Sequence, residues 1–288
     1  MTELLIQTLV QGVLIGGGYA LVALSLGLTY NVSGIINFAH GDFLTLAMYL
    51  ALALQAAWAL DPYVSTVITF PLLFASGVAL YWFLLRPVAR SQLLMVIQLT
   101  LGVTFVLQNG ILMIFGGQPV RVPSDWEASL LTVGDWLFLR TPQVLAFAGS
   151  LLLALLLWIV LDHTETGRRI RAVHQNPRAA ALMGIDVPRV RTLTFGVGIG
   201  IQAIAGALLI PGTPIEPGQG FRYTVIPLMA LVMGGLSDFR GIYLAAILIG
   251  VTEALGTVFV SGTSGMIVPY ALFVLVLLLR PQGLFRRA

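Results

Sequence analysis

Four polar side chains interrupt apolar sequence and are the residues best suited to chemistry in this chain. Asn37, His40 and Asp42 lie close together, and Glu253 lies in the middle of the apolar run 242–260. If that run crosses a bilayer, a carboxylate there costs about 2.5 kcal/mol or more unless it is paired, protonated or hydrated. We therefore predict that Glu253 faces protein or a cavity. Its contact is either a solute ammonium group or an internal partner such as His40.

The segment 31–42 combines the first three of these side chains with Gly34 and Gly41. Glycines at this position allow a break between helices or a close helix approach. Two functions remain open for the polar side chains. Asn37, His40 and Asp42 either line or gate a translocation path near its cytoplasmic end, or form a hydrogen-bond network that caps and positions the next helix.

The elements that must hold these residues are predicted to be membrane helices. Of the 288 residues, 58% are hydrophobic and 9% are charged, whereas a soluble domain has about 25% charged residues. A helix needs about 20 apolar residues to cross a bilayer, and lipid leaves no other partner for its backbone. We expect an all-α integral membrane protein, a polytopic bundle of about eight to nine transmembrane helices in the single domain 1–288. The runs are 4–30, 35–60, 63–85, 93–115, 142–161, 192–210, 223–236, 242–260 and 266–279, and the seventh, which contains Pro227, either spans or is re-entrant.

Arginines predict the orientation of the bundle. All fifteen basic residues are arginine, and one threading places twelve inside and three outside, as the positive-inside rule requires. It puts the N-terminus outside and the C-terminus inside, with 162–191 as a cytoplasmic loop. The external loop 116–141 holds Trp126 and Trp136, which we expect at the interface or in a short lateral helix. The three external arginines are Arg121, Arg140 and Arg222.

The composition also excludes several classes of function. Without cysteine the chain has no disulfide, thiolate metal site or thiol chemistry. No basic stripe with interleaved aromatic residues predicts a nucleic-acid partner. No phosphate-loop motif occurs and lysine is absent, so any ATP that drives transport is hydrolysed by a separate subunit.

The cytoplasmic loop contains the pattern of a complete short helix. Asn176 suits the N-cap, Pro177 the first helical position and Gly184 a left-handed C-terminal stop. Leu182 and Met183 offer an apolar plug. Such a helix is either an ordinary capped connector or a coupling helix that inserts into a cleft of an ATPase. The predicted element consists of Asn176, Pro177, Arg178, Ala179, Ala180, Ala181, Leu182, Met183 and Gly184.

Two longer motifs resemble a known family. The stretch 166–186 reads TGRRIRAVHQNPRAAALMGID, and 34–42 reads GIINFAHGD. Both closely resemble the permeases of branched-chain amino acid ABC transporters, and the shorter stretches 17–21 (GGYAL) and 234–236 (GGL) are similar too. The resemblance spans essentially the whole chain. The loop also loosely resembles the Glu-Ala-Ala…Gly loop of importer permeases in general, although Arg178 stands where that loop has an acidic residue.

This resemblance implies the shorter of two permease subunit types in a bacterial inner-membrane importer. Its partners would be a second permease subunit, two ATP-binding subunits, a periplasmic solute-binding protein and the lipid bilayer. This chain would bind no cofactor, since ATP and magnesium belong to the ATPase subunits. The solute would be a branched-chain or other small apolar amino acid, or a related small solute.

Two other functions are alternatives to a transporter subunit driven by ATP. A stand-alone secondary transporter or channel would use His40, Asp42 and Glu253 as a proton or cation relay. No defensible internal repeat supports it. An intramembrane enzyme has less support, because no zinc-protease, serine-hydrolase or paired-aspartate motif is present.

Overall fold

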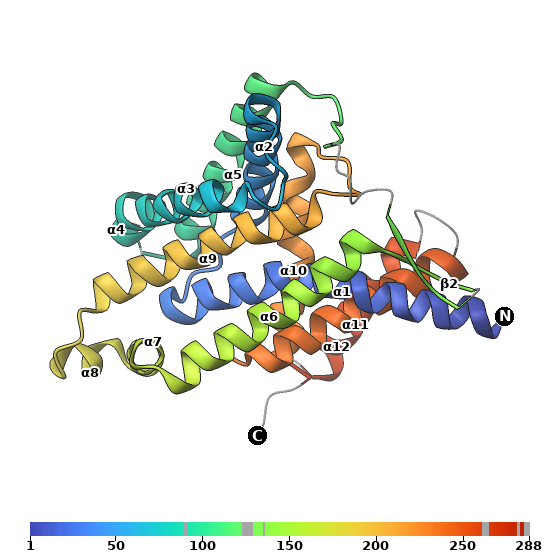
Figure 1. Cartoon of the computed structure of the whole chain (residues 1–288). Coiled ribbons are helices and arrows are strands. Elements are labelled where there is room, and N and C mark those ends of the chain that lie inside the picture. The colour runs from blue at the N-terminus through green and yellow to red at the C-terminus, as the bar shows by residue number, and fades with distance from the viewer. Residues whose placement is uncertain (89–90, 123–128, 135, 261–264, 281–282, 285–288) are drawn as a thin grey trace.

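The chain is a bundle of long helices with one small hairpin (Figure 1). The computed structural model describes residues 1–288 except 89–90, 123–128, 135, 261–264, 281–282 and 285–288. The elements are α1 (Thr2–Ser33), α2 (His40–Trp58), α3 (Thr66–Ala79), the π-helical turn η1 (Leu80–Leu85), α4 (Arg86–Val88), α5 (Leu93–Phe115), β1 (Leu130–Val133), β2 (Leu137–Arg140), α6 (Thr141–His163), α7 (Glu165–Gln175), α8 (Pro177–Leu182), α9 (Val187–Leu209), the 3-10 turn η2 (Pro217–Gln219), α10 (Gly220–Gly234), α11 (Phe239–Phe259) and α12 (Ile267–Leu279).

The helix lengths fit a polytopic membrane protein, as predicted. Within the described residues, seven helical segments are long and apolar enough to cross a bilayer: α1, α2, Pro62–Val88, α5, α6, α9 and α11. Helix α12 is apolar but has 13 residues, and α10 has 15 residues with Pro227 inside it. At 1.5 Å per residue α10 is about 22 Å long, which is shorter than the hydrocarbon thickness of about 30 Å.

Helix α1 lies at the centre of the bundle and packs along α11. The contact is close because small residues face each other. A side chain carbon added at Gly12 would lie 2.6 Å from the Cα of Val251, and one at Gly16 would lie 2.6 Å from the Cα of Ile247. Gly196 of α9 is likewise covered, by Phe74 and Val78 of the 62–88 segment. Glycines at Gly12, Gly16 and Gly196 therefore allow tight helix packing.

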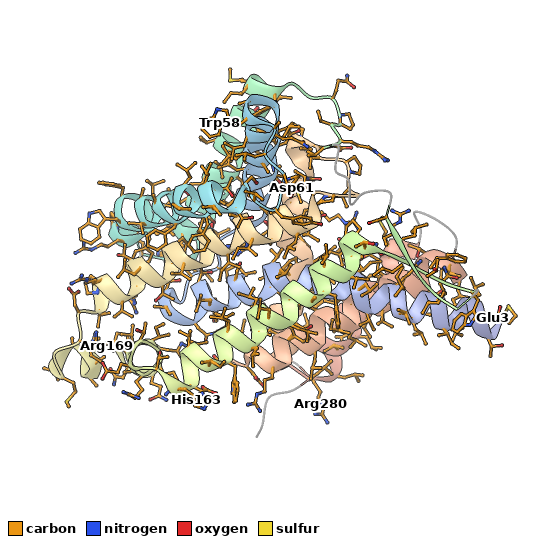
Figure 2. All side chains as sticks on the ribbon, in the orientation of Figure 1. Glu3, Trp58, Asp61, His163, Arg169 and Arg280 are labelled. Atoms are coloured by element: carbon orange, nitrogen blue, oxygen red, sulfur yellow. The ribbon has the colours of Figure 1, made fainter. Side chains whose placement is uncertain are left out.

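Several helix ends gather around α7 and α8 at one end of the bundle (Figure 1). Helix α6 leads directly into α7, and α9 starts five residues after α8 ends. Figure 2 shows Arg169 and His163 at this end and Glu3 at the opposite end of the molecule. The arginines of the 162–191 loop therefore lie at the end far from the N-terminus, which is the separation the positive-inside pattern requires.

The loop that precedes α6 differs from the expectation. Strands β1 and β2 form an antiparallel hairpin, with Leu130 opposite Arg140 and Val133 opposite Leu137. Of the two expectations for this loop, the short lateral helix is wrong for Leu130–Val133 and Leu137–Arg140, and a position at the membrane interface stays a prediction. Alternating residues such as Leu137, Phe138 and Leu139 favour a strand once a partner strand is adjacent. Trp136, 38% exposed, lies between the strands, and Trp126 lies outside the described residues.

Candidate functional site

The short helix α8 has the capped geometry that the sequence predicted. The Asn176 Oδ1 accepts hydrogen bonds from the backbone N–H groups of Arg178 and Ala179, both at 3.0 Å. Gly184 adopts φ 81°, and the N–H of Ile185 reaches back to the Ala180 carbonyl at 3.1 Å. A left-handed glycine with this bond satisfies the carbonyls at the helix end. The helix is therefore held at both ends by local contacts.

The surface of α8 is apolar and uncovered. Leu182 is 88% exposed and Met183 is 82% exposed, while Ala180 is buried against the rest of the segment. Both side chains lie outside the helices that are long and apolar enough to cross a bilayer. An exposed apolar patch of this kind marks an interaction surface.

Hydrogen bonds connect α7 and the start of α9 to the end of α1. His174 of α7 contacts the Asn31 carbonyl through Nδ1 at 2.5 Å, and Arg191 Nε donates to the Val32 carbonyl at 3.1 Å. A carbonyl can only accept, so His174 donates from Nδ1, and its Nε2 lies 3.2 Å from Ser237 Oγ. These contacts occupy carbonyls that the last turn of a helix leaves free. They couple α7 to α1 and to the start of α11.

The break between α1 and α2 buries the three polar residues singled out at 31–42. Asn37, His40 and Asp42 are all fully buried. Asn37 Oδ1 accepts from the Ala39 N–H at 3.1 Å. Asp42 Oδ1 accepts from Gln108 Nε2 of α5 at 2.9 Å. The roles of these three residues in transport remain predictions.

His40 reaches into the centre of the bundle. Its Nε2 lies 2.6 Å from Ser25 Oγ of α1 and 2.5 Å from Gln202 Nε2 of α9, and Gln202 also donates to Ser25. The start of α2 is thereby bound to α1 and α9. Gln202, like Gln108, thus joins helices by interhelical hydrogen bonding.

The same break contacts α10. The backbone N–H of Gly41 donates to Thr224 Oγ1 at 2.8 Å, and that hydroxyl donates to the Phe38 carbonyl at 3.0 Å. A side chain at Gly41 would overlap the carbonyl of Gly220. Glycine is therefore required here by the close approach of α2 and α10, and not by its backbone conformation.

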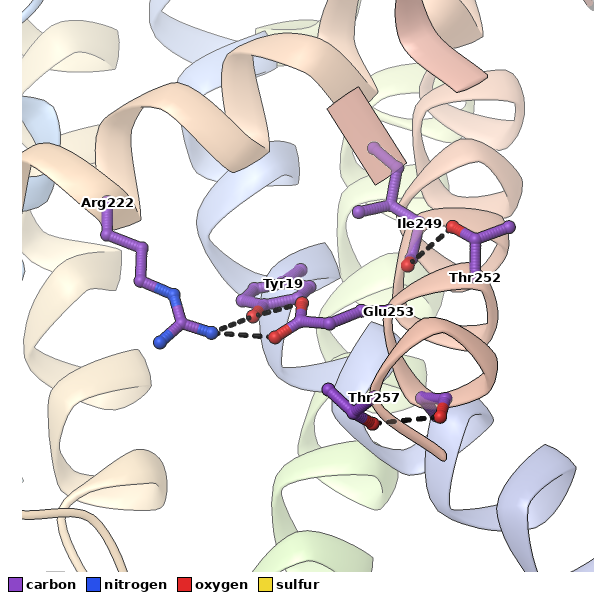
Figure 3. Close-up of polar contacts among 7 residues, drawn as sticks. Tyr19, Arg222, Ile249, Thr252, Glu253 and Thr257 are labelled. Atoms are coloured by element: carbon purple, nitrogen blue, oxygen red, sulfur yellow. Dashed lines mark hydrogen bonds and ion pairs between the residues drawn. The ribbon is translucent and has the colours of Figure 1, made fainter. Parts of the chain in front are cut away.

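Glu253 has a different partner from the one expected. Its Oε1 lies 2.7 Å from Arg222 Nη2, and its Oε2 accepts from the Tyr19 hydroxyl at 2.7 Å (Figure 3). Arg222 Nη2 also donates to the Tyr19 oxygen at 3.1 Å. The suggested pairing with His40 is wrong, because His40 is bound to Ser25 and Gln202 instead. Glu253 is 7% exposed and faces protein, as predicted.

This Tyr19–Arg222–Glu253 cluster joins three elements deep in the bundle. Tyr19 comes from α1, Arg222 from α10 and Glu253 from α11 (Figure 3). Glu253 lies about 21 Å along α11 from Phe239, and Tyr19 lies about 21 Å along α1 from Ser33. Phe239 and Ser33 both lie at the end of the bundle that holds α7 and α8. The cluster is therefore at the same distance from that end along both helices. It lies near the middle of α1 and toward the Phe259 end of α11.

Sequence reasoning did not identify Tyr19 and Arg222 as members of a site. Each had a signal. Tyr19 lies in the stretch 17–21 that resembles the family, and Arg222 is an arginine directly at the start of an apolar helix. What was missing is the pairing, because Glu253 is 31 residues from Arg222 and 234 from Tyr19.

Comparison with known proteins identifies the family. The model of the family "branched-chain amino acid transport system / permease component" matches residues 8–277. The high-affinity branched-chain amino acid transport system permease protein LivH of Salmonella typhimurium is 30% identical, over 98% of this chain and 96% of its own length. The corresponding protein BraD of Pseudomonas aeruginosa is 28% identical with the same coverage, and a probable LivH of Methanocaldococcus jannaschii is 29% identical over 99% of this chain and 95% of its own.

A solved structure shares the fold. PsaBC from Streptococcus pneumoniae, in complex with a Fab, superimposes with a TM-score of 0.51 at 15% identity, over 94% of this chain and 91% of that chain. At this identity the likeness concerns the fold alone. The full-length sequence matches carry the assignment: this chain is a multi-pass membrane transport subunit, without an enzyme activity of its own, and belongs to the permease components of branched-chain amino acid transport systems.

Proposed function

We propose that this permease imports a small aliphatic amino acid or a related small solute, driven by ATP that a separate pair of subunits hydrolyses. The names of the relatives support the solute class. The single observation that supports the coupling is the tip of α8. A rigid, doubly capped helix presents Leu182 and Met183 to solvent at one end of the bundle.

The proposed coupling route starts at α8 and continues through α7. A partner that grips Leu182 moves α7, which is bound to the end of α1 through His174, while α9 is bound to the same end through Arg191. Helix α1 in turn holds Tyr19 beside Glu253. A displacement at the cytoplasmic face can thus reach the polar cluster through one continuous helix.

The orientation belongs to the same proposal. With α8 in the cytoplasm, the arginines of 162–191 lie inside and the N-terminus lies outside. The importer would then consist of this chain, a second permease, two ATP-binding subunits and an external solute-binding protein. The relay alternative has less support, because both oxygens of Glu253 are already bonded, one of them to a cation.

Co-purification with an ATPase tests the coupling surface. The tagged chain is expressed with the genes that neighbour its own, extracted in mild detergent and assayed for bound ATPase. Leu182→Asp is expected to lose the ATPase, because it places a charge in an apolar contact. Leu131→Asp is the matched control, since Leu131 is also exposed (46%) but lies in the hairpin.

Two results would contradict the proposal. One is a wild-type chain that purifies alone and monodisperse from cells shown to contain the ATPase. The other is uptake by the purified chain alone, in liposomes without ATP, driven only by an ion gradient. The second result would move the relay of His40, Asp42 and Glu253 to first place.

A further inference from the structure

A cavity of about 210 Å³ lies beside the Tyr19–Arg222–Glu253 cluster. Its walls come from α1, α6, α9, α10, α11 and the turn after α9. It lies inside this one chain, so its walls do not depend on a second permease. It lies at the depth of Tyr19 and Glu253, about 21 Å along α1 and α11 from the end of the bundle that holds α7 and α8.

The charges around the cavity favour an anionic group. Arg140, Arg222 and Glu253 all line it, which leaves one positive charge in excess. Arg140 is exposed at the start of α6, and the Arg222 side chain is 45% exposed. Glu253 is already satisfied, because Tyr19 and Arg222 occupy its two oxygens. A bound carboxylate would therefore meet arginine and not a competing free carboxylate.

The guanidinium of Arg222 has hydrogen-bond donors that its contacts with Glu253 and Tyr19 do not use. Both of its contacts with the cluster use Nη2, and Figure 3 shows its other terminal nitrogen turned away from Glu253. Among the described residues, no hydrogen bond is made by Nη1 or Nε. A guanidinium carries five N–H donors in a planar fork that matches a carboxylate. Nη1 and Nε of Arg222 can thus each donate a single hydrogen bond to a carboxylate oxygen while Nη2 keeps its contacts with Glu253 and Tyr19.

Much of the rest of the cavity wall is aliphatic, and Gln143, Thr213 and Tyr223 also line it. Leu14 of α1, Ala146 of α6, and Leu208 and Leu209 of α9 line it. A site with a few convergent polar groups on an apolar wall is typical of a small-molecule pocket. A ligand that fits must combine a carboxylate with a short branched or straight hydrocarbon chain.

We propose that this cavity binds the transported amino acid within the subunit. Arg140 and Arg222 hold the solute carboxylate, and the leucine wall holds its aliphatic side chain. This inference rests on the proposed function and deepens it, because it names the site and the recognised groups. A phospholipid would offer a phosphate and a chain to the same wall, and the test below distinguishes it.

Direct binding tests the site. The full chain, purified with whichever subunits accompany it but without an external binding protein, is titrated with radiolabelled leucine by scintillation proximity. Isovalerate, which keeps the carboxylate and the branched chain, is expected to compete. Isopentylamine, which lacks the carboxylate, is expected not to compete. Arg140→Gln is expected to weaken leucine binding about tenfold or more, because it removes a charge-assisted contact.

Two further variants separate loss of the site from loss of the fold. The double variant Arg222→Gln/Glu253→Gln removes the cation without leaving a buried carboxylate, and it is expected to weaken binding by at least about tenfold. Thr213→Phe, at the half-exposed turn of the cavity wall, is expected to exclude leucine by volume. Arg121→Gln is the control, because it removes an arginine from the same face outside the cavity. Each variant is first shown to be monodisperse with wild-type thermal stability.

These experiments distinguish failure of the cavity proposal from failure of the proposed importer function. If the ATPase co-purifies and hydrolyses ATP, but leucine does not bind or binds all variants equally, the cavity is not the site and the importer assignment stands. Recovery of a stoichiometric phospholipid that leucine cannot displace also overturns the cavity proposal. If no ATPase is recovered, the binding assay on the chain alone still decides whether the cavity recognises the amino acid.

Discussion

Helices α1 and α5 have similar sequences in composition but opposite environments in the bundle. Their mean hydropathies are 1.8 and 1.6, yet 72% of the most apolar window is buried in α1 and 17% in α5. Glycines of α1 face the backbone of α11, whereas a side chain at Gly102 of α5 would meet nothing within 4 Å. Tyr19 of α1 bonds two other helices, while Asn109 of α5 bonds the Phe105 carbonyl of its own helix. Hydropathy alone identifies which segments are long and apolar enough to span. Small residues and polar side chains that bond other helices distinguish a central helix such as α1 from a peripheral one such as α5.

The largest effect is expected from breaking the polar cluster that α1 helps to hold. Arg222→Met should lower the free energy of unfolding by about 3 kcal/mol, because Glu253 then stays buried with only the Tyr19 hydroxyl as partner. Equilibrium unfolding by titration with SDS in mixed micelles measures it.

The matched control is the double variant Arg222→Met/Glu253→Gln. It should recover most of the lost stability, since no charge is then left without a partner. An equal loss in the single and double variants would show that Arg222 acts through packing and not through the ion pair.

A smaller loss is expected from filling the contact between α1 and α11. Gly16→Ala should cost about 2 kcal/mol, because its new carbon would lie 2.6 Å from a backbone atom that cannot rotate away. In the exposed helix, Gly102→Ala should instead raise stability by roughly 0.5 kcal/mol, since alanine is the better helix former and meets no neighbour. The same SDS titration compares them. If both substitutions changed stability in the same direction, the central position of α1 would be in doubt.

The smallest effect is expected on the exposed face of α5. Asn109→Leu should change the unfolding free energy of the isolated chain by no more than about 0.5 kcal/mol, because the lost bond lies within one helix. Thermal unfolding in detergent, followed by tryptophan fluorescence, is sufficient. A loss comparable to that of Gly16→Ala would mean that Asn109 supports the fold of this subunit.

The sequence predicts those features that depend on neighbouring residues. Helix α8 was expected from Asn176, Pro177 and Gly184, and it is found with both caps, because capping is decided within a few residues. The interruption near Gly34 was expected for the same reason. The apolar runs identified the spans, because a segment in lipid must satisfy its own backbone hydrogen bonds and therefore forms a helix.

Features that depend on distant contacts were not predictable. The Glu253 partner could not be found by pattern, since Arg222 and Tyr19 reach it only after three helices pack. The hairpin 130–140 was missed because four-residue strands carry little periodicity and gain their stability from each other. The cavity itself has no sequence signature, as its leucines are no different from those that face lipid.

The length of α1 adds a dependence on the bilayer itself. With 32 residues it extends about 48 Å, whereas the hydrocarbon layer is about 30 Å thick. Helix α1 must therefore tilt or project from the layer, and its exposed first turns, including Leu4 and Leu5, are the part that adjusts. Its other end is fixed to α7 by His174 and to α9 by Arg191. A thinner membrane would tilt α1 further about that fixed end. The mismatch between the length of α1 and the hydrocarbon thickness would therefore change the tilt of the same helix that joins the coupling surface to the cavity.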